Sequence, residues 1–211
     1  MINIHQWLQL FIDQVNQTTL WEWLAVILGI AEVLLAKINN IWLYPTGIAG
    51  TVIGIYILML AGLYAESALS VYYIVMSVYG WVYWIRRRNE PPVKITRATK
   101  KEWLITLLIV MIGWVIFYVL LTKFTTSNVP VWDAWVSSTA WAGMWLLARR
   151  KLENWIMLNL SNLFAIPLLC YKHLIMFAML TSILFIVAIF GFFEWRDILK
   201  KDQPGESLLT A

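Results

Sequence analysis

Apolar residues form seven long segments along the chain, separated by short polar connections. A helix that crosses a membrane needs about 20 predominantly apolar residues. One connection differs from the others. Residues 86–102, RRRNEPPVKITRATKKE, are strongly basic and contain a Pro-Pro step, so we expect them to lie in water. The pattern predicts membrane-spanning helices at about 20–37, 41–61, 65–85, 103–122, 132–149, 154–171 and 174–195.

The composition supports this interpretation. Of the 211 residues, 61% are hydrophobic and 13% are charged, and the mean hydropathy is +0.72. Soluble domains are about 45–50% apolar and about 25% charged, so this chain lacks the polar surface of a water-soluble globule. The fourteen Trp and nine Tyr fit as well, because these amphipathic rings favour membrane interfaces. We therefore expect an integral membrane protein.

The reactive residue types are sparse. The single cysteine, Cys170, excludes an intramolecular disulfide and a multi-cysteine metal site. His5 and His173 stand far apart, with no metal-ligand spacing around them. The chain has no Walker motif and no nucleophile–base pair. We expect neither an enzyme nor a metal or cofactor site.

The cations fall almost entirely on one side of the predicted membrane. Fourteen of the sixteen Lys and Arg follow the first, third, fifth and seventh spans, whereas only Lys123 and Lys172 lie on the other side. Cytoplasmic loops carry the excess of positive charge in membrane proteins. We expect the N-terminus to lie outside and the C-terminus to lie in the cytoplasm. The fourteen are Lys37, Arg86, Arg87, Arg88, Lys94, Arg97, Lys100, Lys101, Arg149, Arg150, Lys151, Arg196, Lys200 and Lys201.

Two pairs of short motifs indicate an internal repeat. LLAKINNIW at 34–42 resembles LLARRKLENW at 146–155, with an offset of 112 to 113 residues. YGWVYW at 79–84 resembles FGFFEW at 190–195, with an offset of 111. Two three-helix units joined by one helix run in the same direction, which is a parallel 3+1+3 repeat of a kind found in small transporters. The predicted parts are an extracytoplasmic segment (1–19), bundle 1 (20–88), a basic loop with a linker helix (89–131), bundle 2 (132–198) and a disordered tail (199–211).

The third span carries a polar and aromatic stripe. Ser70, Tyr73, Ser77, Trp81 and Trp84 are spaced by 3, 4, 4 and 3 residues, which places them on one helical face. The first three are candidates for a substrate site, with Tyr73 as a ring-stacking wall. Two alternatives stay open: hydroxyls can bond back to their own helix, and the tryptophans can anchor the helix at the interface.

The sixth span carries a second stripe, with Trp155, Asn159 and Asn162 spaced by 4 and 3 residues. An unpaired amide in an apolar medium costs about 1–3 kcal/mol, so both asparagines should face protein or water. They are candidates for ligand contact, although hydrogen bonds between helices would satisfy them too. The repeat matches Trp155 with Trp42, Asn159 with Thr46, Asn162 with Ala49, and Ser70 with Thr181. The predicted site is Ser70, Tyr73, Ser77, Trp42, Thr46, Trp155, Asn159, Asn162 and Thr181.

Glu32 is the one acidic residue well inside a predicted span. Intramembrane carboxylates are functional by default, so it could couple transport to protons. The alternative, which the sequence favours, is that Glu32 pairs with Lys37 near the cytoplasmic face.

Three segments resemble the PnuC family of vitamin transporters: IWLYPTGIAG (41–50), LYAESALSVYYIVMSVYGWVYW (63–84) and ENWIMLNLSN (153–162). The resemblance covers about 20–198. It implies a seven-helix, SWEET-like fold of two three-helix bundles joined by a linker helix. It also implies uptake of nicotinamide riboside across the bacterial inner membrane by facilitated diffusion, driven by a cytoplasmic kinase that phosphorylates and traps the substrate.

The resemblance places Ser70, Tyr73 and Ser77 in the third-helix motif of the family, and Trp155, Asn159 and Asn162 in its sixth-helix motif. Nicotinamide riboside carriers are expected to have Gln where this chain has Ser70. Two alternatives therefore stay open. One is the same fold carrying thiamine or another vitamin, and the other is a membrane receptor or scaffold that transports nothing. The sequence leaves open whether the protein forms a homo-oligomer.

Overall fold

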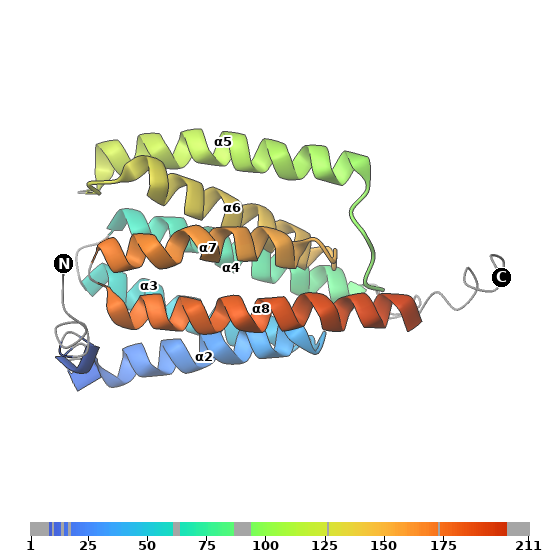
Figure 1. Cartoon of the computed structure of the whole chain (residues 1–211), viewed down its shortest axis with the longest axis horizontal. Coiled ribbons are helices and arrows are strands. Elements are labelled where there is room, and N and C mark those ends of the chain that lie inside the picture. Colours follow the sequence, from blue (N-terminus) through green and yellow to red (C-terminus); the bar gives the residue numbers. More distant parts are fainter. Residues whose placement is uncertain are drawn as a thin grey trace.

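The computed structural model describes residues 9, 11–13, 15–16, 18–60, 64–86, 94–125, 127–172 and 174–201. Most of the expected N-terminal segment, the Pro-Pro step of the basic loop and the tail after residue 201 lie outside these residues. Seven long helices account for most of the described chain (Figure 1). They are α2 (Leu20–Lys37), α3 (Leu43–Leu60), α4 (Tyr64–Arg86), α5 (Lys100–Phe124), α6 (Pro130–Ala148), α7 (Asn154–Tyr171) and α8 (Ile175–Lys201).

Each predicted span coincides with one of these helices, and the ends differ by only a few residues. Helix α5 begins three residues before the predicted span because Thr99 caps it. The Thr99 hydroxyl accepts a hydrogen bond from the Glu102 N–H, and the Glu102 carboxylate accepts one from the Thr99 N–H at 2.8 Å. This reciprocal capping satisfies two of the N–H groups that a helix start leaves free. Thr19 and Glu22 start α2 in the same way.

Four helices within the described residues are long and apolar enough to cross a membrane: α3, α5, α7 and the part of α8 from Phe177 to Lys201. Large apolar side chains on these helices face outward. On α5, for example, Leu104, Leu107 and Met111 are all more than half exposed. Exposed apolar surface of this extent is normal for helices that lie in lipid and abnormal for a soluble protein.

Six of the helices form a closed ring. Neighbours along the chain pack together within α2–α3–α4 and within α6–α7–α8, and the ring closes through contacts of α4 with α6 and of α8 with α2. Figure 1 shows α7 and α8 in front of the fainter α4 and α3, while α5 lies outside the ring against α6. No helix of the ring contacts the helix opposite it among the described residues. The inner faces of six helices therefore point toward one another.

The two turns at one end of the ring have the same conformation. Asn39, between α2 and α3, and Arg150, between α6 and α7, have φ values of 56° and 54°. The next residues, Asn40 and Lys151, each donate a hydrogen bond to the carbonyl five residues earlier, at 2.9 and 3.0 Å. Each of these pairs is separated by 111 residues.

This common turn corrects the register of the sequence repeat. The LLA motifs suggested an offset of 112 to 113 and matched Trp155 with Trp42. The turn hydrogen bonds instead match Trp155 with Tyr44 and Asn162 with Thr51. The prediction was wrong because a Trp near a helix start is a common interface residue, whereas a tight turn requires a fixed number of residues.

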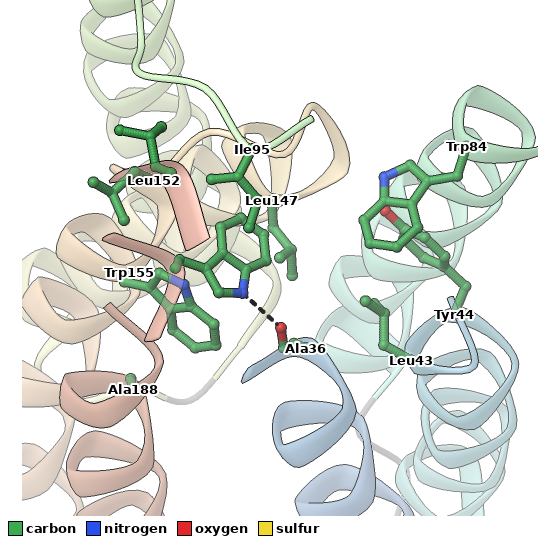
Figure 2. Packing of buried hydrophobic residues seen from close by; sticks show 11 residues of the cluster. Ala36, Leu43, Tyr44, Trp84, Ile95, Leu147, Leu152, Trp155 and Ala188 are labelled. Atoms are coloured by element: carbon green, nitrogen blue, oxygen red, sulfur yellow. Dashed lines mark hydrogen bonds between the residues drawn. The ribbon is translucent and has the colours of Figure 1, made fainter. Parts of the chain in front are cut away.

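Two aromatic pairs at this end of the ring are related by the same offset of 111 residues. Tyr44 meets Trp84 edge-on, with ring centroids 5.2 Å apart and an interplanar angle of 90°. Trp155 meets Trp195 in the same way, at 5.6 Å and 87°. Both pairs belong to one buried cluster that also contains Ala36, Leu147 and Leu152, and Figure 2 shows most of it. We call this end of the molecule the basic end, because it also carries Arg149, Arg150 and Lys151 in the α6–α7 turn.

Candidate functional site

Glycines allow the aromatic rings at the basic end to pack against the helix backbone. A Cβ added at Gly80 of α4 would lie 2.5–2.7 Å from the ring atoms and hydroxyl of Tyr44. A Cβ added at Gly191 of α8 would lie 2.7–2.9 Å from the Trp155 indole. Since real Cβ atoms do not approach other atoms this closely, both positions require glycine for this packing.

Two contacts join the halves of the ring at the basic end. The Trp195 indole N–H of α8 donates to the carbonyls of Ala36 and Lys37, at 2.9 and 3.1 Å. Figure 2 draws the bond to Ala36 as a dashed line. In the other direction, the Arg150 guanidinium lies 3.3 Å from the centroid of Trp84 and donates to the Asn39 carbonyl at 3.4 Å. The ring is thus held shut at this end.

Burial lowers the pKa of the Arg150 guanidinium to about 10. This pKa remains far above neutral pH, so Arg150 keeps its charge. A buried charge is tolerated when it is paired or lies on an aromatic face, and Trp84 supplies such a face. Arg150 is therefore a fixed positive charge at the basic end of the ring.

On α4, the predicted stripe lies partly inside the protein. Ser77 is buried, whereas Ser70 and Tyr73 are half-buried. Gly80 and Trp84, which continue the same face at helical spacing, contact Tyr44 of α3. The neighbouring Tyr72 faces α6, where its ring stacks on Trp141 with centroids 3.8 Å apart. The stripe therefore lies on the side of α4 toward α3.

On α7, the contacts of the neighbouring residues show which way Asn162 faces. Trp155 packs against α8, and Leu158 packs against Gly143 of α6, where an added Cβ would lie 2.7 Å away. At 3.6 residues per turn, Asn162 lies between these two directions, on the inner face of the ring. The side-chain carbonyl oxygen of Asn159 is buried without a hydrogen-bond partner in the described part of the chain.

The other predicted site residues are placed as follows. Thr181 is half-buried on α8. The Thr46 hydroxyl donates to the carbonyls of Trp42 and Leu43, at 3.0 and 2.9 Å, at the start of its own helix. The Trp42 side chain is 64% exposed, whereas Trp155 is fully packed. Contact of any of these residues with a substrate stays a prediction.

Glu32 of α2 lies against α3. A Cβ added at Gly47 would overlap the Glu32 carboxylate, with the carboxyl carbon 2.5 Å away. The expected pairing of Glu32 with Lys37 does not occur, because the Lys37 ammonium lies 5.7 Å from the centroid of Phe190. No hydrogen bond or ion pair reaches the Glu32 carboxylate within the described residues.

The second half of the ring has an equivalent contact, in which the glycine and the large side chain stand on the opposite helices. The offset of 111 matches Glu32 with Gly143 and Gly47 with Leu158. In the first half the large side chain comes from α2 and the glycine from α3, whereas in the second half the glycine comes from α6 and the leucine from α7. A carboxylate in the first half therefore stands where the second half has an apolar side chain.

Tyr44 and Thr51 are not among the site residues predicted from the sequence. Tyr44 is buried beside Gly80, and its hydroxyl has no hydrogen-bond partner in the part of the chain that the structure describes. Thr51 corresponds to Asn162 and lies on α3 between the directions of Tyr44 and Gly47, hence on the inner face. The offset of 111 from the aromatic motifs, applied to the whole chain, would have found both.

Two pockets formed by described residues lie away from the predicted site. One, of about 690 Å³, is lined by Trp114, Trp132, Trp135 and Phe164 among others. The second, of about 400 Å³, lies between α4, α5 and α6 and includes Tyr72 and Trp141. Their lining is almost entirely apolar, which is typical of surfaces that lipid covers. Neither pocket is lined by any of the nine predicted site residues.

Comparison with known proteins agrees with a ring of transmembrane helices. Residues 19–197 match the family model described as "Nicotinamide mononucleotide transporter". The chain belongs to this family. The match extends from the capping residue of α2 nearly to the end of α8, so it includes every helix of the ring. The resemblance to PnuC transporters is confirmed, and the protein is a multi-pass membrane transporter and not an enzyme.

A solved structure shares the fold. The chain is similar to a protein described as "Crystal structure of the Vitamin B3 transporter PnuC", with a TM-score of 0.70 and 17% sequence identity. The similarity covers 92% of this chain and 88% of that one. A search of curated protein sequences found no match. At this identity the similarity establishes the fold, while the residues of the site have to be judged from this chain.

Proposed function

We propose that this protein takes up nicotinamide riboside across the bacterial inner membrane by facilitated diffusion. The observation that carries the proposal is the family match over residues 19–197, together with the fold of a vitamin B3 transporter. Phosphorylation by a separate cytoplasmic kinase would keep the internal concentration of free substrate low and so drive uptake.

The proposed architecture is a parallel, SWEET-like 3+1+3 repeat, with α2–α3–α4 and α6–α7–α8 as the bundles and α5 as the linker. The recurrence of turn geometry and aromatic pairs at an offset of 111 supports it. The N-terminus is outside and the basic end is cytoplasmic, because the positive-inside rule assigns fourteen of sixteen cations to that side.

The proposed substrate site lies on the inner face of the ring, about the axis that relates the halves. Tyr73 and Ser77 of α4 and Asn159 and Asn162 of α7 are its main residues. Of the remaining predicted residues, we assign Ser70, Thr181 and Trp155 to the surroundings of this site. Trp42 and Thr46 are the weakest members, because one is mostly exposed and the other is bonded to its own helix region.

This set of side chains suits a flat, cationic heteroaromatic molecule with hydroxyl groups. A tyrosine ring attracts a planar cation by about 0.5–2 kcal/mol. Asparagine amides both donate and accept, so Asn159 and Asn162 could bind ribose hydroxyls or a carboxamide. The free carbonyl oxygen of Asn159 supplies one such acceptor.

Thiamine is the second candidate substrate. Ser70 favours it, because the resemblance leads us to expect Gln at that position in nicotinamide riboside carriers. Serine has a shorter reach and cannot reproduce the two-sided hydrogen bonding of an amide. Thiamine is also a flat cation, so the aromatic residues do not distinguish the two substrates.

Calorimetric titration of the purified protein in detergent tests the proposal, with nicotinamide riboside, nicotinamide mononucleotide and thiamine as ligands. We expect saturable binding of nicotinamide riboside only. The mononucleotide adds a phosphate, which the interior carboxylate Glu32 would repel. Saturable binding of thiamine alone would assign the protein to the second candidate.

Flux separates a transporter from a receptor or scaffold. In liposomes that contain the purified protein, labelled nicotinamide riboside should enter down its gradient and should not enter empty liposomes. When a proton gradient is imposed across the liposome membrane, an uncoupler should leave the initial rate unchanged, because facilitated diffusion uses no ion gradient. A rate that collapses with uncoupler would instead indicate proton coupling, and binding without flux would indicate a receptor.

A further inference from the structure

The carboxylate of Glu32 occupies an unusual place. It lies inside α2 and against the backbone of α3 at Gly47, and it has no hydrogen bond or ion pair among the described residues. Acidic residues are rare within membrane-spanning helices, face the protein interior and usually mark a site. A purely structural carboxylate would be expected to have a partner.

The surroundings of Glu32 place it on the inner face of the ring. On α2, the exposed Ile27 and Leu34 mark the outward face, and at 3.6 residues per turn Glu32 lies about 140–160° away from them. On α4, Tyr73 lies about 160° from the exposed Val75 in the same way. Helices α2 and α4 do not contact each other, because α3 lies between them. Side chains from these two helices come near each other only where both point toward the inside of the ring.

Tyr44 completes this group from α3. Its side chain is 1% exposed, and its hydroxyl has no hydrogen-bond partner among the residues described. A buried hydroxyl without a partner is uncommon and usually has a functional reason. Gly47 makes room for the carboxylate and Gly80 makes room for the tyrosine, so the local sequence of two helices is adapted to this arrangement.

The charges near Glu32 do not neutralise it directly. The guanidinium of Arg150 lies on the Trp84 ring and donates to the Asn39 carbonyl. Lys37 lies over Phe190. No ion pair joins either cation to Glu32 in the described structure.

We propose that Glu32, with the ring of Tyr73, forms the subsite that binds the positive charge of the substrate, and that the buried Tyr44 supports this subsite from α3. The carboxylate attracts a cationic ring in a medium of low dielectric constant, and the half-buried Tyr73 offers an electron-rich ring face beside it. The inference deepens the proposed function and rests on it. The expected substrate is a flat heteroaromatic cation, and Glu32 is the residue that recognises its positive charge.

The two halves then bind different parts of one molecule. The position equivalent to Glu32 in the second half is Gly143, so no carboxylate stands there. The second half instead provides Asn159 and Asn162. The cationic ring would lie toward α2, α3 and α4, and the hydroxyl-bearing part toward α7. A substrate without internal symmetry would thus bind in one orientation.

The test compares a cation with its neutral analogue. Nicotinamide riboside carries a positive ring, whereas its dihydro form has nearly the same shape and no charge. Calorimetry in detergent would measure both ligands with the wild-type protein, with Glu32→Gln and with Glu194→Gln. Glu194 is an exposed carboxylate near the end of α8 and serves as the matched control. If the wild type binds thiamine instead, thiamine and its neutral thiophene isostere replace the pair.

We expect Glu32→Gln to weaken binding of the cation by about tenfold or more, as removal of a charge partner in a partly buried site does. Binding of the neutral form should change little, and Glu194→Gln should change neither. An unchanged preference for the cation in Glu32→Gln overturns this inference alone. A wild-type protein that binds neither vitamin overturns the proposed function and the inference together.

A second pair of variants guards against a misfolded Glu32→Gln. An added methyl at Gly47 would displace the carboxylate, whereas an added methyl at Gly54 of the same helix would meet no atom within 4 Å. Gly47→Ala should reduce the preference for the cation, and Gly54→Ala should keep it. Equal preference in both alanine variants would contradict the assigned position of the carboxylate.

Discussion

Two glycines at the basic end do the same task in the two halves of the ring, and each is required by one aromatic ring. At Gly80 and Gly191 an added Cβ would lie 2.5–2.9 Å from Tyr44 and Trp155, respectively. Both rings are almost completely buried. They have no free space into which to move, so a methyl group at either glycine would push two helices apart.

We therefore expect Gly80→Ala and Gly191→Ala each to lower the free energy of unfolding by about 1–3 kcal/mol, the usual cost of overpacking a close contact. Gly54→Ala is the control, because the added methyl meets open space, and alanine favours helix over glycine by about 0.5–1 kcal/mol. Thermal unfolding in detergent measures all three. A Gly80→Ala variant as stable as Gly54→Ala would show that Tyr44 repacks without strain.

Single asparagines should determine affinity at the proposed site. We expect Asn159→Leu and Asn162→Leu each to weaken vitamin binding by about tenfold or more, because a lost hydrogen bond to a bound polar group costs about 1–3 kcal/mol. Thr122→Val is the control, since the Thr122 hydroxyl bonds to Tyr118 and Val119 of its own helix, and α5 lies outside the ring. Titration of folded protein tests this. Unchanged affinity in both asparagine variants would assign them to helix packing.

At the scale of helices, the ring closes by two different contacts at equivalent places. Trp195 of α8 bonds to the end of α2. Its counterpart by the offset of 111 is Trp84 of α4, whose indole N–H is buried without a hydrogen-bond partner among the described residues. Arg150 covers that ring instead. The two junctions between the halves are therefore not equivalent, and one of them depends on a cation.

The α8–α2 junction should depend on the Trp195 indole N–H. Trp195→Phe keeps an aromatic ring but removes the donor, and we expect the free energy of unfolding to fall by about 1–2 kcal/mol. Trp42→Phe is the control, because that side chain is 64% exposed and should change stability by less than about 0.5 kcal/mol. Thermal unfolding in detergent measures both. Equal stability of the two variants would mean that packing alone holds this junction.

At the scale of the whole molecule, the charge distribution predicts the orientation in the membrane. Lys123, at the end of α5, should face outside, and Lys200, near the end of α8, should face the cytoplasm. Figure 1 shows the ends of these two helices at opposite ends of the molecule. Both side chains are exposed, so cysteines introduced there would be accessible to a reagent.

The experiment uses a Cys170→Ser background with a single cysteine at position 123 or 200. In intact cells, a membrane-impermeant maleimide should label the cysteine at position 123 and leave that at position 200 unlabelled until the cells are opened. The two positions act as controls for each other. The reverse pattern would place the basic end outside and contradict the proposed direction of trapping.

The sequence by itself determined the helices, because their length and apolar content are set by the membrane and can be read locally. Each of the seven predicted spans coincides with a helix, and the capping box at Thr99 explains the early start of α5. The segments around Tyr73, Asn159 and Asn162 carried the family resemblance that the family match confirms. The repeat was visible, but its register was off by one to two residues.

Only the tertiary structure decided which residues meet. The turns at Asn39 and Arg150 set the offset of 111 and replaced Trp42 by Tyr44 as the partner of Trp155. The closed ring placed Glu32 against Gly47, where the sequence suggested a partner five residues along the same helix. Pairing within one helix follows from spacing, whereas contact between helices depends on how they pack. For that reason, the role proposed for the Glu32 carboxylate depends on the packing of α2, α3 and α4, which the sequence does not specify.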